Sequence, residues 1–502
     1  MEYLKKWGIE INKTTTITQS VKDLFFLIIL LILSFYAVYF TPQNISRVFF
    51  LLPLFVFLLS NRNYLWFAYF FVLAQGPGYF FADFSGASQQ RLPLYTFLAG
   101  MSFTPLDAFI VFALLKALIK GRKMKLKLRD PLLILLAYII FSVGVNSAIY
   151  GTDIGVLAGN SRWVFCYSII ISFSYLVNQK HYIYRFIMLI FPFVFFVFFT
   201  QIYAVVTGNE LINLFNSGFR GIELNSVTGD IRTVMAGELI LLFSLLSALI
   251  MLVNKESKLP KLYLVSVITV SFISVFLSAT RLWFLIFSFI MAGYVFVSKR
   301  KILSVLGISS ILVLTTSVLI YSGLVSVDTL LYSPWMRLQQ VFKVATGNVY
   351  MVDTARNRLV NQLPIIMEVI RQNPLIGYGF SDVTMNFYNN NLGFVNTILM
   401  FGVIGFSFFL LFFIKVFEML ISSIRKISIN NAFRLPLKII VLAWGGVLIG
   451  YFTTWDFFSM YFDKVFFVSI LIVFTEFFVV QADKEEMLLQ YQNIEGAQSM
   501  RT

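Results

Sequence analysis

Long apolar stretches separated by short polar connections dominate the chain. A membrane-crossing helix needs ~20 consecutive apolar residues, and fourteen stretches come close to that length. They lie near residues 24–40, 44–60, 64–82, 102–119, 131–150, 162–178, 183–206, 233–253, 261–279, 281–298, 302–322, 394–418, 437–454 and 463–481. The pattern predicts about fourteen transmembrane helices with both chain ends in the cytoplasm.

Two of these stretches, 44–60 and 261–298, cannot be assigned as transmembrane helices from their length alone. The stretch 44–60 contains Arg47 and Pro53, and 261–298 is one apolar block interrupted only near Arg281. Lysines flank that block on both sides, so the positive-inside rule puts both of its ends in the cytoplasm. Only an even number of crossings satisfies this condition, and the block is therefore divided into two helices.

The composition agrees with a membrane protein. Of 502 residues, 59% are hydrophobic and 13% charged, and the mean hydropathy is +0.83. So little polar surface cannot cover a soluble globule of this size. The formal net charge of +15 is the excess that cytoplasmic loops bring to any polytopic protein, so no nucleic-acid partner is expected. We predict an all-α polytopic membrane protein in which residues 1–502 form one integral domain, with a cytoplasmic tail at 482–502.

Few residues are available for metal or cofactor chemistry. Cys166 is the single cysteine and His181 the single histidine, so neither an internal disulfide nor a Cys/His metal cluster can form. No P-loop, dinucleotide-binding glycine motif or Gly-x-Ser-x-Gly elbow occurs in the required context. The first apolar run lacks a small-residue cleavage site, so no signal peptide is predicted. We expect a protein without metal, nucleotide or other cofactor.

The cations differ between the two sides of the predicted bundle. The topology places 27 lysines and arginines inside and 12 outside; the inside set contains 19 Lys and 8 Arg, and the outside set contains 10 Arg and only Lys343 and Lys464. Either cation can set topology, whereas the planar guanidinium of arginine can hold a phosphate with two hydrogen bonds. Snorkelling anchors at the outer interface are the alternative, and they suit Arg47 and Arg91. The arginine excess favours a phosphate-bearing substrate on the outside.

One outer connection, residues 323–393, is far longer than the others, and loops of this size are usually functional. Within it, Asp353 or Thr354 can cap a helix that starts at Ala355. Apolar residues recur at helical spacing along this helix, at Leu359, Leu363, Ile366 and Ile370. We predict an amphipathic helix on the outer surface of the bundle, kinked by Pro364. A stop-and-turn sequence follows at 373–379.

Arginines and scattered carboxylates on one face of an apolar bundle suit a particular reaction. Cleavage of a sugar–diphosphate bond develops negative charge on the leaving oxygen, and fixed guanidinium groups in a water-poor site stabilise that charge. A carboxylate can take the proton from the incoming sugar hydroxyl. A lipid diphosphate donor arrives already activated, so neither metal nor nucleotide is required.

Several short motifs occur in a defined order along the outer face. They are Asp230-Ile231-Arg232, Leu277-Ser278-Ala279-Thr280-Arg281, Ala355-Arg356-Asn357-Arg358, Asn373-Pro374-Leu375-Ile376-Gly377-Tyr378-Gly379 and Gly402-Val403-Ile404-Gly405. In this order, and with a long late outer loop, the chain resembles the O-antigen polymerase/O-antigen ligase superfamily. The resemblance covers about residues 230 to 405 in sequence and most of the chain in layout.

This resemblance implies a GT-C-like glycosyltransferase of the bacterial inner membrane, with its active site facing the periplasm. It would polymerise undecaprenyl-diphosphate-linked oligosaccharide into O-antigen or a similar surface polysaccharide, with undecaprenyl diphosphate as the leaving group. Besides this lipid-linked substrate, the resemblance implies contact with membrane lipids and a chain-length regulator as a partner.

Two other functions stay open. The ligase branch transfers glycan to lipid A core and carries His-Asn ahead of Gly-x-x-Gly; this chain has Asn391-Leu392 there, and the missing histidine favours a polymerase. A flippase of lipid-linked oligosaccharides would only transport its substrate. Such transporters usually show two related halves, which a single long late loop does not favour.

Five arginines are candidates for binding the diphosphate. Arg281 comes first because its neighbours on both sides are apolar, and Arg232 comes second. Arg356 and Arg358 lie two residues apart and cannot share a helix face, so Arg358 is preferred. Arg220 completes the set.

Three carboxylates are candidates for the catalytic base: Glu368, Asp382 and Asp353. Glu368 could instead pair with Arg371, three residues further along the predicted helix.

Overall fold

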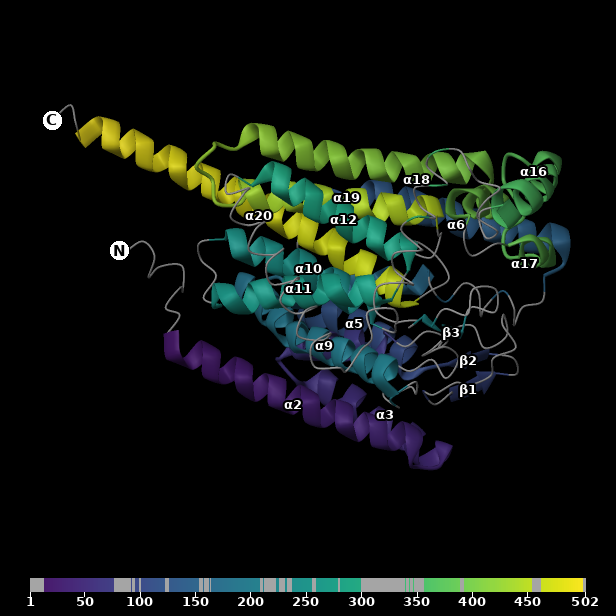
Figure 1. The fold of residues 1–502 in the computed structure, drawn as a ribbon, viewed down its shortest axis with the longest axis horizontal. Helices are drawn as coiled ribbons and strands as arrows, with labels where there is room; N and C mark the ends of the chain where they lie inside the picture. The colour runs from purple at the N-terminus through teal and green to yellow at the C-terminus, as the bar shows by residue number, and fades with distance from the viewer. Residues whose placement is uncertain are drawn as a thin grey trace.

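The structure is a computed structural model that describes residues 13–75, 92, 95–98, 101–121, 126–152, 157, 162, 164–207, 211, 223–224, 231–232, 237–254, 259–278, 280–298, 339, 343, 346, 356–388, 392–453 and 462–499. This part of the chain is a bundle of helices (Figure 1).

The first ten helices among the described residues are α2 (Lys13–Tyr39), α3 (Gln43–Leu59), α4 (Asn63–Leu73), α5 (Pro105–Lys120), α6 (Arg129–Tyr150), α8 (Ser168–Leu176), α9 (Lys180–Thr207), α10 (Glu238–Val253), α11 (Lys261–Leu277) and α12 (Arg281–Val297). The later elements are a π-helical turn η2 (Asn357–Gln362), α16 (Leu363–Gln372), α17 (Asp382–Phe387), α18 (Gly393–Lys426), α19 (Arg434–Thr453) and α20 (Phe462–Ser499). Two antiparallel hairpins, which the sequence did not predict, interrupt the connections: β1 (Tyr95–Leu98) with β2 (Met101–Phe103), and β3 (Glu223–Leu224) with β4 (Ile231–Arg232).

Six of the described helices are long and apolar enough to cross a membrane, namely α2, α6, α9, α18, α19 and α20. Shorter apolar helices accompany them at 43–59, 63–73, 164–176, 238–253, 261–277 and 281–297. The chain is therefore a predominantly helical, multi-pass membrane protein, as its apolar pattern predicted. The predicted span at 302–322 lies outside the described residues, and the total of fourteen spans stays a prediction.

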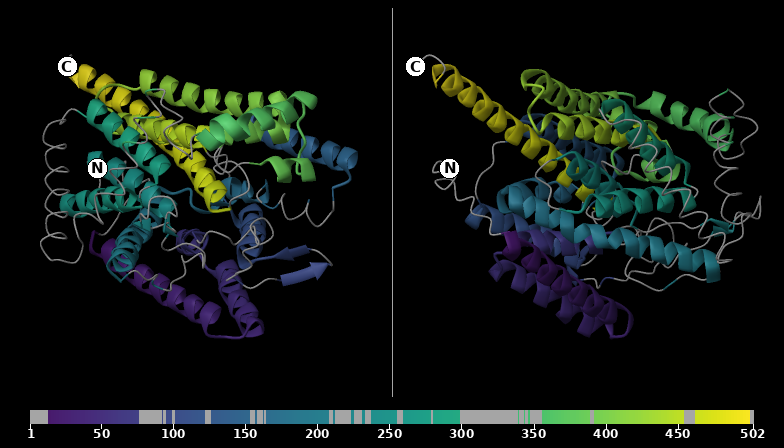
Figure 2. Two further views of the ribbon diagram at one scale, coloured as in Figure 1. Left: turned by 45° about the vertical axis from the view of Figure 1, so that its right-hand side comes forward. Right: turned by 60° about the vertical axis from the view of Figure 1, so that its left-hand side comes forward.

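The two ends of the bundle carry different elements. The start of α2 and the end of α20 lie at one end, which we call the inner end, whereas both hairpins, α16 and α17 lie at the opposite, outer end (Figures 1 and 2). Gln201, near the end of α9, donates a 3.0 Å hydrogen bond to the carbonyl of Ser274, near the end of α11. These two helices therefore end together, and the next helix, α12, begins at that same outer end.

Helix α20 passes through the core and then continues beyond it. Every residue from 465 to 479 is buried, and the buried Glu476 carboxylate accepts a 2.5 Å hydrogen bond from the backbone N–H of Leu128, just before α6. The predicted tail at 482–502 extends this helix to Ser499, and Figures 1 and 2 show α20 projecting from the inner end. The Glu486 carboxylate accepts a 2.8 Å hydrogen bond from the backbone N–H of Ser428, which fixes the start of the projecting part of α20.

Candidate functional site

Helix α18 is broken inside its outer half. Gly402 has φ 66° and ψ −176°, a conformation open in practice only to glycine. The carbonyl groups one turn before the break lose their intrahelical partners and are taken up by another segment. Tyr378 N donates to the carbonyl of Leu399 (2.9 Å), and Gly379 N donates to the carbonyl of Met400 (2.7 Å).

The amides after the break are satisfied by the same segment. Val403 N donates to the carbonyl of Pro374 (2.8 Å), and Ile404 N donates to the carbonyl of Leu375 (3.2 Å). Residues 373–381, which we call the docking loop, thus pair with α18 on both sides of Gly402. Buried backbone polar groups must be satisfied within the protein, and this pairing achieves it.

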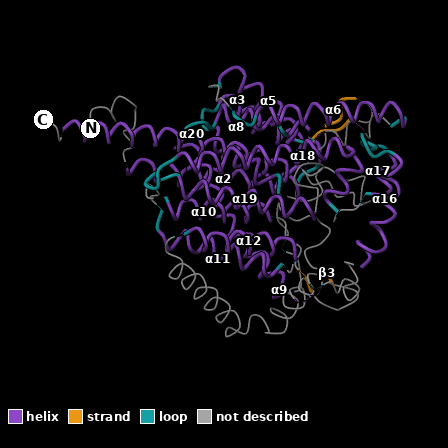
Figure 3. Tube along the Cα trace, turned by 90° about the horizontal axis from the view of Figure 1, so that it is seen from above, coloured by secondary structure: helices purple, strands orange, loops and turns teal. Residues whose placement is uncertain are grey.

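Helix α6 closes the third side of this junction. Tyr138 OH donates to the carbonyl of Phe401 (2.8 Å). Ser142 Oγ and Asn146 Nδ2 both donate to the carbonyl of Ile376, at 3.1 and 3.3 Å. Figures 1 and 3 show the outer part of α6 beside α16 and α17. The two parts of α18, before and after Gly402, and helix α6 therefore fix the position of the docking loop.

Two glycines allow this close approach. A Cβ on Gly402 would lie 2.0 Å from the carbonyl oxygen of Leu375, and a Cβ on Gly377, which has φ 68°, would lie 2.5 Å from the carbonyl carbon of Met400. Both positions therefore exclude any side chain. These glycines belong to two of the five motifs that carried the family resemblance, 373–379 and 402–405, and the structure brings these two motifs into direct contact.

The amphipathic helix of the long loop caps the outer end. Ile366 and Ile370 of α16 pack against Tyr378 and the start of α18, and Tyr378 OH donates to the carbonyl of Val369 (2.9 Å). Burial, with Tyr150 nearby, raises the pKa of Tyr378, so this phenol stays a hydrogen-bond donor at neutral pH. Pro364 lies in the first turn of α16, directly after the π-helical turn, where it removes no α-helical hydrogen bond.

The candidate carboxylates lie around this cap. Glu368 pairs with Arg371 at 3.0 Å, and both side chains are largely exposed (65% and 74%), which is the alternative weighed from the sequence. Asp382 is the first residue of α17, directly after the docking loop, and is exposed. Asp353 lies outside the described residues.

The candidate arginines come from several elements. Arg281 is the first residue of α12 and is half-buried; α12 packs mainly on α19. Arg358 is half-buried within η2, whereas Arg356 just before it is exposed. The backbone of Arg232 pairs with that of Glu223 in the β3–β4 hairpin. Arg220 lies outside the described residues.

The polar contacts of the docking loop were not predicted from the sequence. Tyr138, Ser142 and Asn146 lie in an apolar stretch that reads only as a transmembrane helix. A signal was present, because these residues recur every four positions and so share one helix face. A partly buried ion pair between Arg162 and Asp107 was missed as well; its Thr104-x-x-Asp107 spacing is that of a capping box, which the structure contains.

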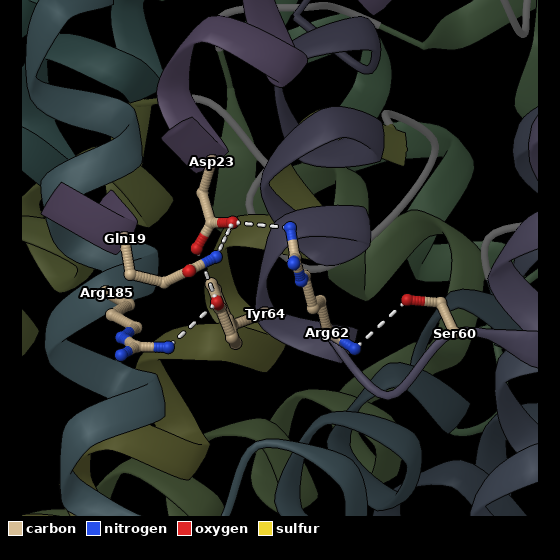
Figure 4. A network of polar contacts seen from close by, with 6 residues as sticks. All are labelled: Gln19, Asp23, Ser60, Arg62, Tyr64 and Arg185. Atoms are coloured by element: carbon tan, nitrogen blue, oxygen red, sulfur yellow. Dashed lines mark hydrogen bonds and ion pairs between the residues drawn. The ribbon is translucent and has the colours of Figure 1, made fainter. Parts of the chain in front are cut away.

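A second polar network occupies the inner end, between α2, α4 and α9. Asp23 is fully buried and accepts hydrogen bonds from Tyr64 OH (2.5 Å) and Arg62 Nη1 (3.0 Å). Gln19 Nε2 also donates to Asp23 (2.9 Å), and Arg185 Nη1 donates to Tyr64 OH (3.1 Å). Figure 4 shows the two arginines on opposite sides of the Asp23–Tyr64 pair, so they do not converge on a common ligand. This network ties the peripheral helix α2 to the bundle.

No known protein-family profile matches this chain, and no curated protein matches it significantly.

Proposed function

We propose that this protein is a membrane glycosyltransferase that polymerises polyprenyl-diphosphate-linked oligosaccharide at the outer end of its helical bundle. The observation that carries the proposal is the docking of residues 373–379 onto the break at Gly402. Gly402 is the tenth residue of α18, about 14 Å along the helix at 1.5 Å per residue. Broken helices at such depth are characteristic of substrate sites in membrane proteins.

The start of α12 has the chemistry to hold the diphosphate. Thr280 precedes the helix without a side-chain capping bond, and Arg281 is its first residue. The N–H groups and dipole of a helix N-terminus favour an anion, and a guanidinium adds bidentate hydrogen bonds. In the proposed reaction Arg281 stabilises the charge that grows on the departing diphosphate. Arg358, Arg356, Arg232 and Arg220 are the further candidates for this role.

The reaction is a direct displacement. The hydroxyl oxygen of one lipid-linked repeat attacks the anomeric carbon of another, and the bond from that carbon to the diphosphate breaks. The diphosphate leaves with the bonding electron pair, and a carboxylate accepts the hydroxyl proton. Asp382 beside the docking loop, Glu368 and Asp353 are the candidate bases. The site faces the periplasm of a bacterial inner membrane in this proposal, and a chain-length regulator is its proposed partner.

Purified protein in lipid nanodiscs, supplied with a synthetic undecaprenyl-diphosphate-linked repeat, tests the proposal. A polymerase releases undecaprenyl diphosphate and forms longer glycan. Release of the carrier only when lipid A core is added would instead identify a ligase, and movement of the intact substrate across a bilayer would identify a flippase.

Variants connect the activity to its residues. Arg281→Ala should lower the rate on the order of 100-fold, the usual effect of removing a donor to a developing anion. Arg425→Ala is the matched control, because Arg425 is an exposed arginine in the last turn of α18, at the inner end, and its rate should be unchanged. Amide variants of Asp382, Glu368 and Asp353 identify the base; normal polymer from all three would exclude a carboxylate from this role.

A further inference from the structure

Two buried polar atoms lie at the junction of α6 and the docking loop without a hydrogen-bond partner among the described residues. They are Oδ1 of Asn146 and Oγ of Ser381, and the two residues are 0% and 1% exposed. A buried polar atom without a partner costs about 1–3 kcal/mol, so each one in a folded protein calls for an explanation.

The two residues belong to one small region. A Cβ on Gly379 would lie 2.8 Å from the Cβ of Asn146, so the turn that leads into Ser381 lies directly against α6. The amide nitrogen of Asn146 is occupied by the carbonyl of Ile376 (3.3 Å) and by Ser142 Oγ (3.2 Å). The carbonyl oxygen of Asn146 is therefore the atom left to accept a hydrogen bond.

Helix capping does not explain Ser381. Serine is favoured at the N-cap because its hydroxyl accepts a hydrogen bond from an amide in the first helical turn. Ser381 occupies the N-cap of α17, with φ −75° and ψ 169°, yet its side chain makes no capping bond.

We propose that Asn146 and Ser381 form a subsite for a sugar hydroxyl of the acceptor oligosaccharide; the inference rests on the proposed function and assigns a binding role to residues outside its catalytic set. The oxygen of an asparagine side chain can only accept a hydrogen bond. An ionised phosphate has no proton to donate, whereas a sugar hydroxyl donates to Asn146 and exchanges a hydrogen bond with Ser381. This junction therefore suits the sugar, and the arginine-bearing start of α12 suits the diphosphate.

Two further buried hydroxyl oxygens lie close to Asn146 in the sequence. Ser147 Oγ and Thr152 Oγ1, at the outer end of α6, are also buried without a partner among the described residues. Asn146 and Ser381 are enclosed, so a sugar hydroxyl can reach them only when the docking loop separates from α6. This separation breaks the hydrogen bonds of Ser142 and Asn146 to the carbonyl of Ile376 and retains the pairing of the loop with α18. A side-chain hydrogen bond from Thr384 to the carbonyl of Gly379 (2.8 Å) fixes α17 to the docking loop, so the two segments would move together.

The test uses Ser381→Ala, which removes a hydroxyl without removing a hydrogen bond seen in the structure. Its melting temperature should equal or exceed that of the wild type, because an unsatisfied buried hydroxyl is lost. The probe is the oligosaccharide repeat without its lipid, prepared from the polysaccharide of the cell that produces this protein. The affinity of Ser381→Ala for this repeat, measured by calorimetry in nanodiscs, should fall about tenfold, which is the loss expected for one hydrogen bond. Ser381→Thr retains a hydroxyl and should recover most of that affinity.

Ser407→Ala is the matched control, since the hydroxyl of this exposed serine on α18 bonds only within its own helix, to the carbonyl of Val403 (2.8 Å). Its affinity should not change. Three results would each overturn the subsite. Ser381→Ala could bind the repeat as tightly as the wild type, Ser381→Ala could lose stability and affinity equally, or the wild type could fail to bind the delipidated repeat. Polymer formation by the wild type together with one of these results leaves the proposed function standing. Sugar binding without polymer formation would overturn the proposed function alone.

Discussion

At the scale of single residues, the break in α18 depends on the absence of one side chain. Gly402 combines a positive φ with backbone atoms of the docking loop at contact distance. Neither condition could be relieved by a shift of a flexible side chain, because the opposing atoms belong to the backbone of Leu375 and Ile376. The junction is therefore defined sterically as well as by its hydrogen bonds.

Gly402→Ala should destabilise the protein by about 3 kcal/mol or more, since the strained backbone alone costs ~1–3 kcal/mol and the overlap adds to it. Thermal unfolding in detergent measures the loss, and the variant should also fail to make polymer. Gly144→Ala is the control, because a Cβ on Gly144 of α6 meets no atom within 4 Å. Alanine there should leave stability equal or slightly higher; equal melting temperatures for both variants would contradict the steric account.

Tyr138→Phe should cost about 1–2 kcal/mol, because it leaves the carbonyl of Phe401 without the donor that Tyr138 supplies. Chemical denaturation monitored by tryptophan fluorescence measures the difference. Tyr36→Phe is the control, because it removes the same hydroxyl group from a tyrosine on α2 that is 58% exposed, and it should not change stability. A similar loss in both variants would show that the hydroxyl of Tyr138 does not stabilise the junction.

At the scale of elements, α2 is a peripheral helix held by polar contacts at discrete points. Much of its surface is exposed apolar side chain, including Phe25 and Ile32, as expected for a helix that faces lipid. Its buried face packs Leu27, Leu30 and Leu31 into the core. Asp23 near the inner end and a 2.7 Å hydrogen bond between Ser34 and Tyr69 deeper in the bundle add polar contacts to this packing.

Asp23→Ala should lower stability by on the order of 3 kcal/mol, because the buried hydroxyl of Tyr64 loses its acceptor and Arg62 loses its ion pair. The lost ion pair contributes little to this change, because the Arg62 side chain is 55% exposed and its charge is screened by water. Limited proteolysis should show earlier release of α2. In Asp130→Ala, the loss of an exposed pair with Arg129 should change stability by less than about 1 kcal/mol; an equal effect of the two substitutions would argue against the tether.

The elements also show what the sequence could and could not predict. Apolar runs predicted the helical, multi-pass class, because hydropathy largely decides which segments leave water, and six of the described helices are long enough to cross a membrane. Helix α4 ends at Leu73, inside the predicted span 64–82, so run length did not predict every helix end. The docking of 373–379 on Gly402 was not predicted from spacing, since its hydrogen bonds are between backbone groups and carry no side-chain signature. The resemblance selected the same two motifs without revealing that they touch. Asn146 and Ser381 were not predicted from the sequence, because a buried polar atom without a partner can be recognised only in the structure.

At the scale of the whole molecule, the alternating helices put the docking loop and the α18–α19 connection at opposite ends. The side chain of Arg371, at the end of α16 and just before the docking loop, is 74% exposed. Ile429 in the other connection is 72% exposed, and Cys166 is fully buried. The native cysteine should therefore not react with a thiol reagent, and single introduced cysteines report on sidedness.

Arg371→Cys should react with a membrane-impermeant maleimide in sealed, right-side-out vesicles, whereas Ile429→Cys should react only after detergent is added. Gel mobility after labelling measures both. The unchanged protein is the control and should stay unlabelled in each condition. Equal labelling of the two cysteines before detergent would contradict the proposed membrane orientation.

The projecting part of α20 has a practical consequence for imaging. Its base is fixed by Glu486 on Ser428 and by Glu485 on the backbone of Ala432, and the helix then runs without interruption to Ser499. A helical fusion partner joined in phase after Ser499 would inherit the direction of α20 rather than swing on a linker. Such a rigid fiducial would give electron-microscopy particles an orientation mark outside the detergent belt.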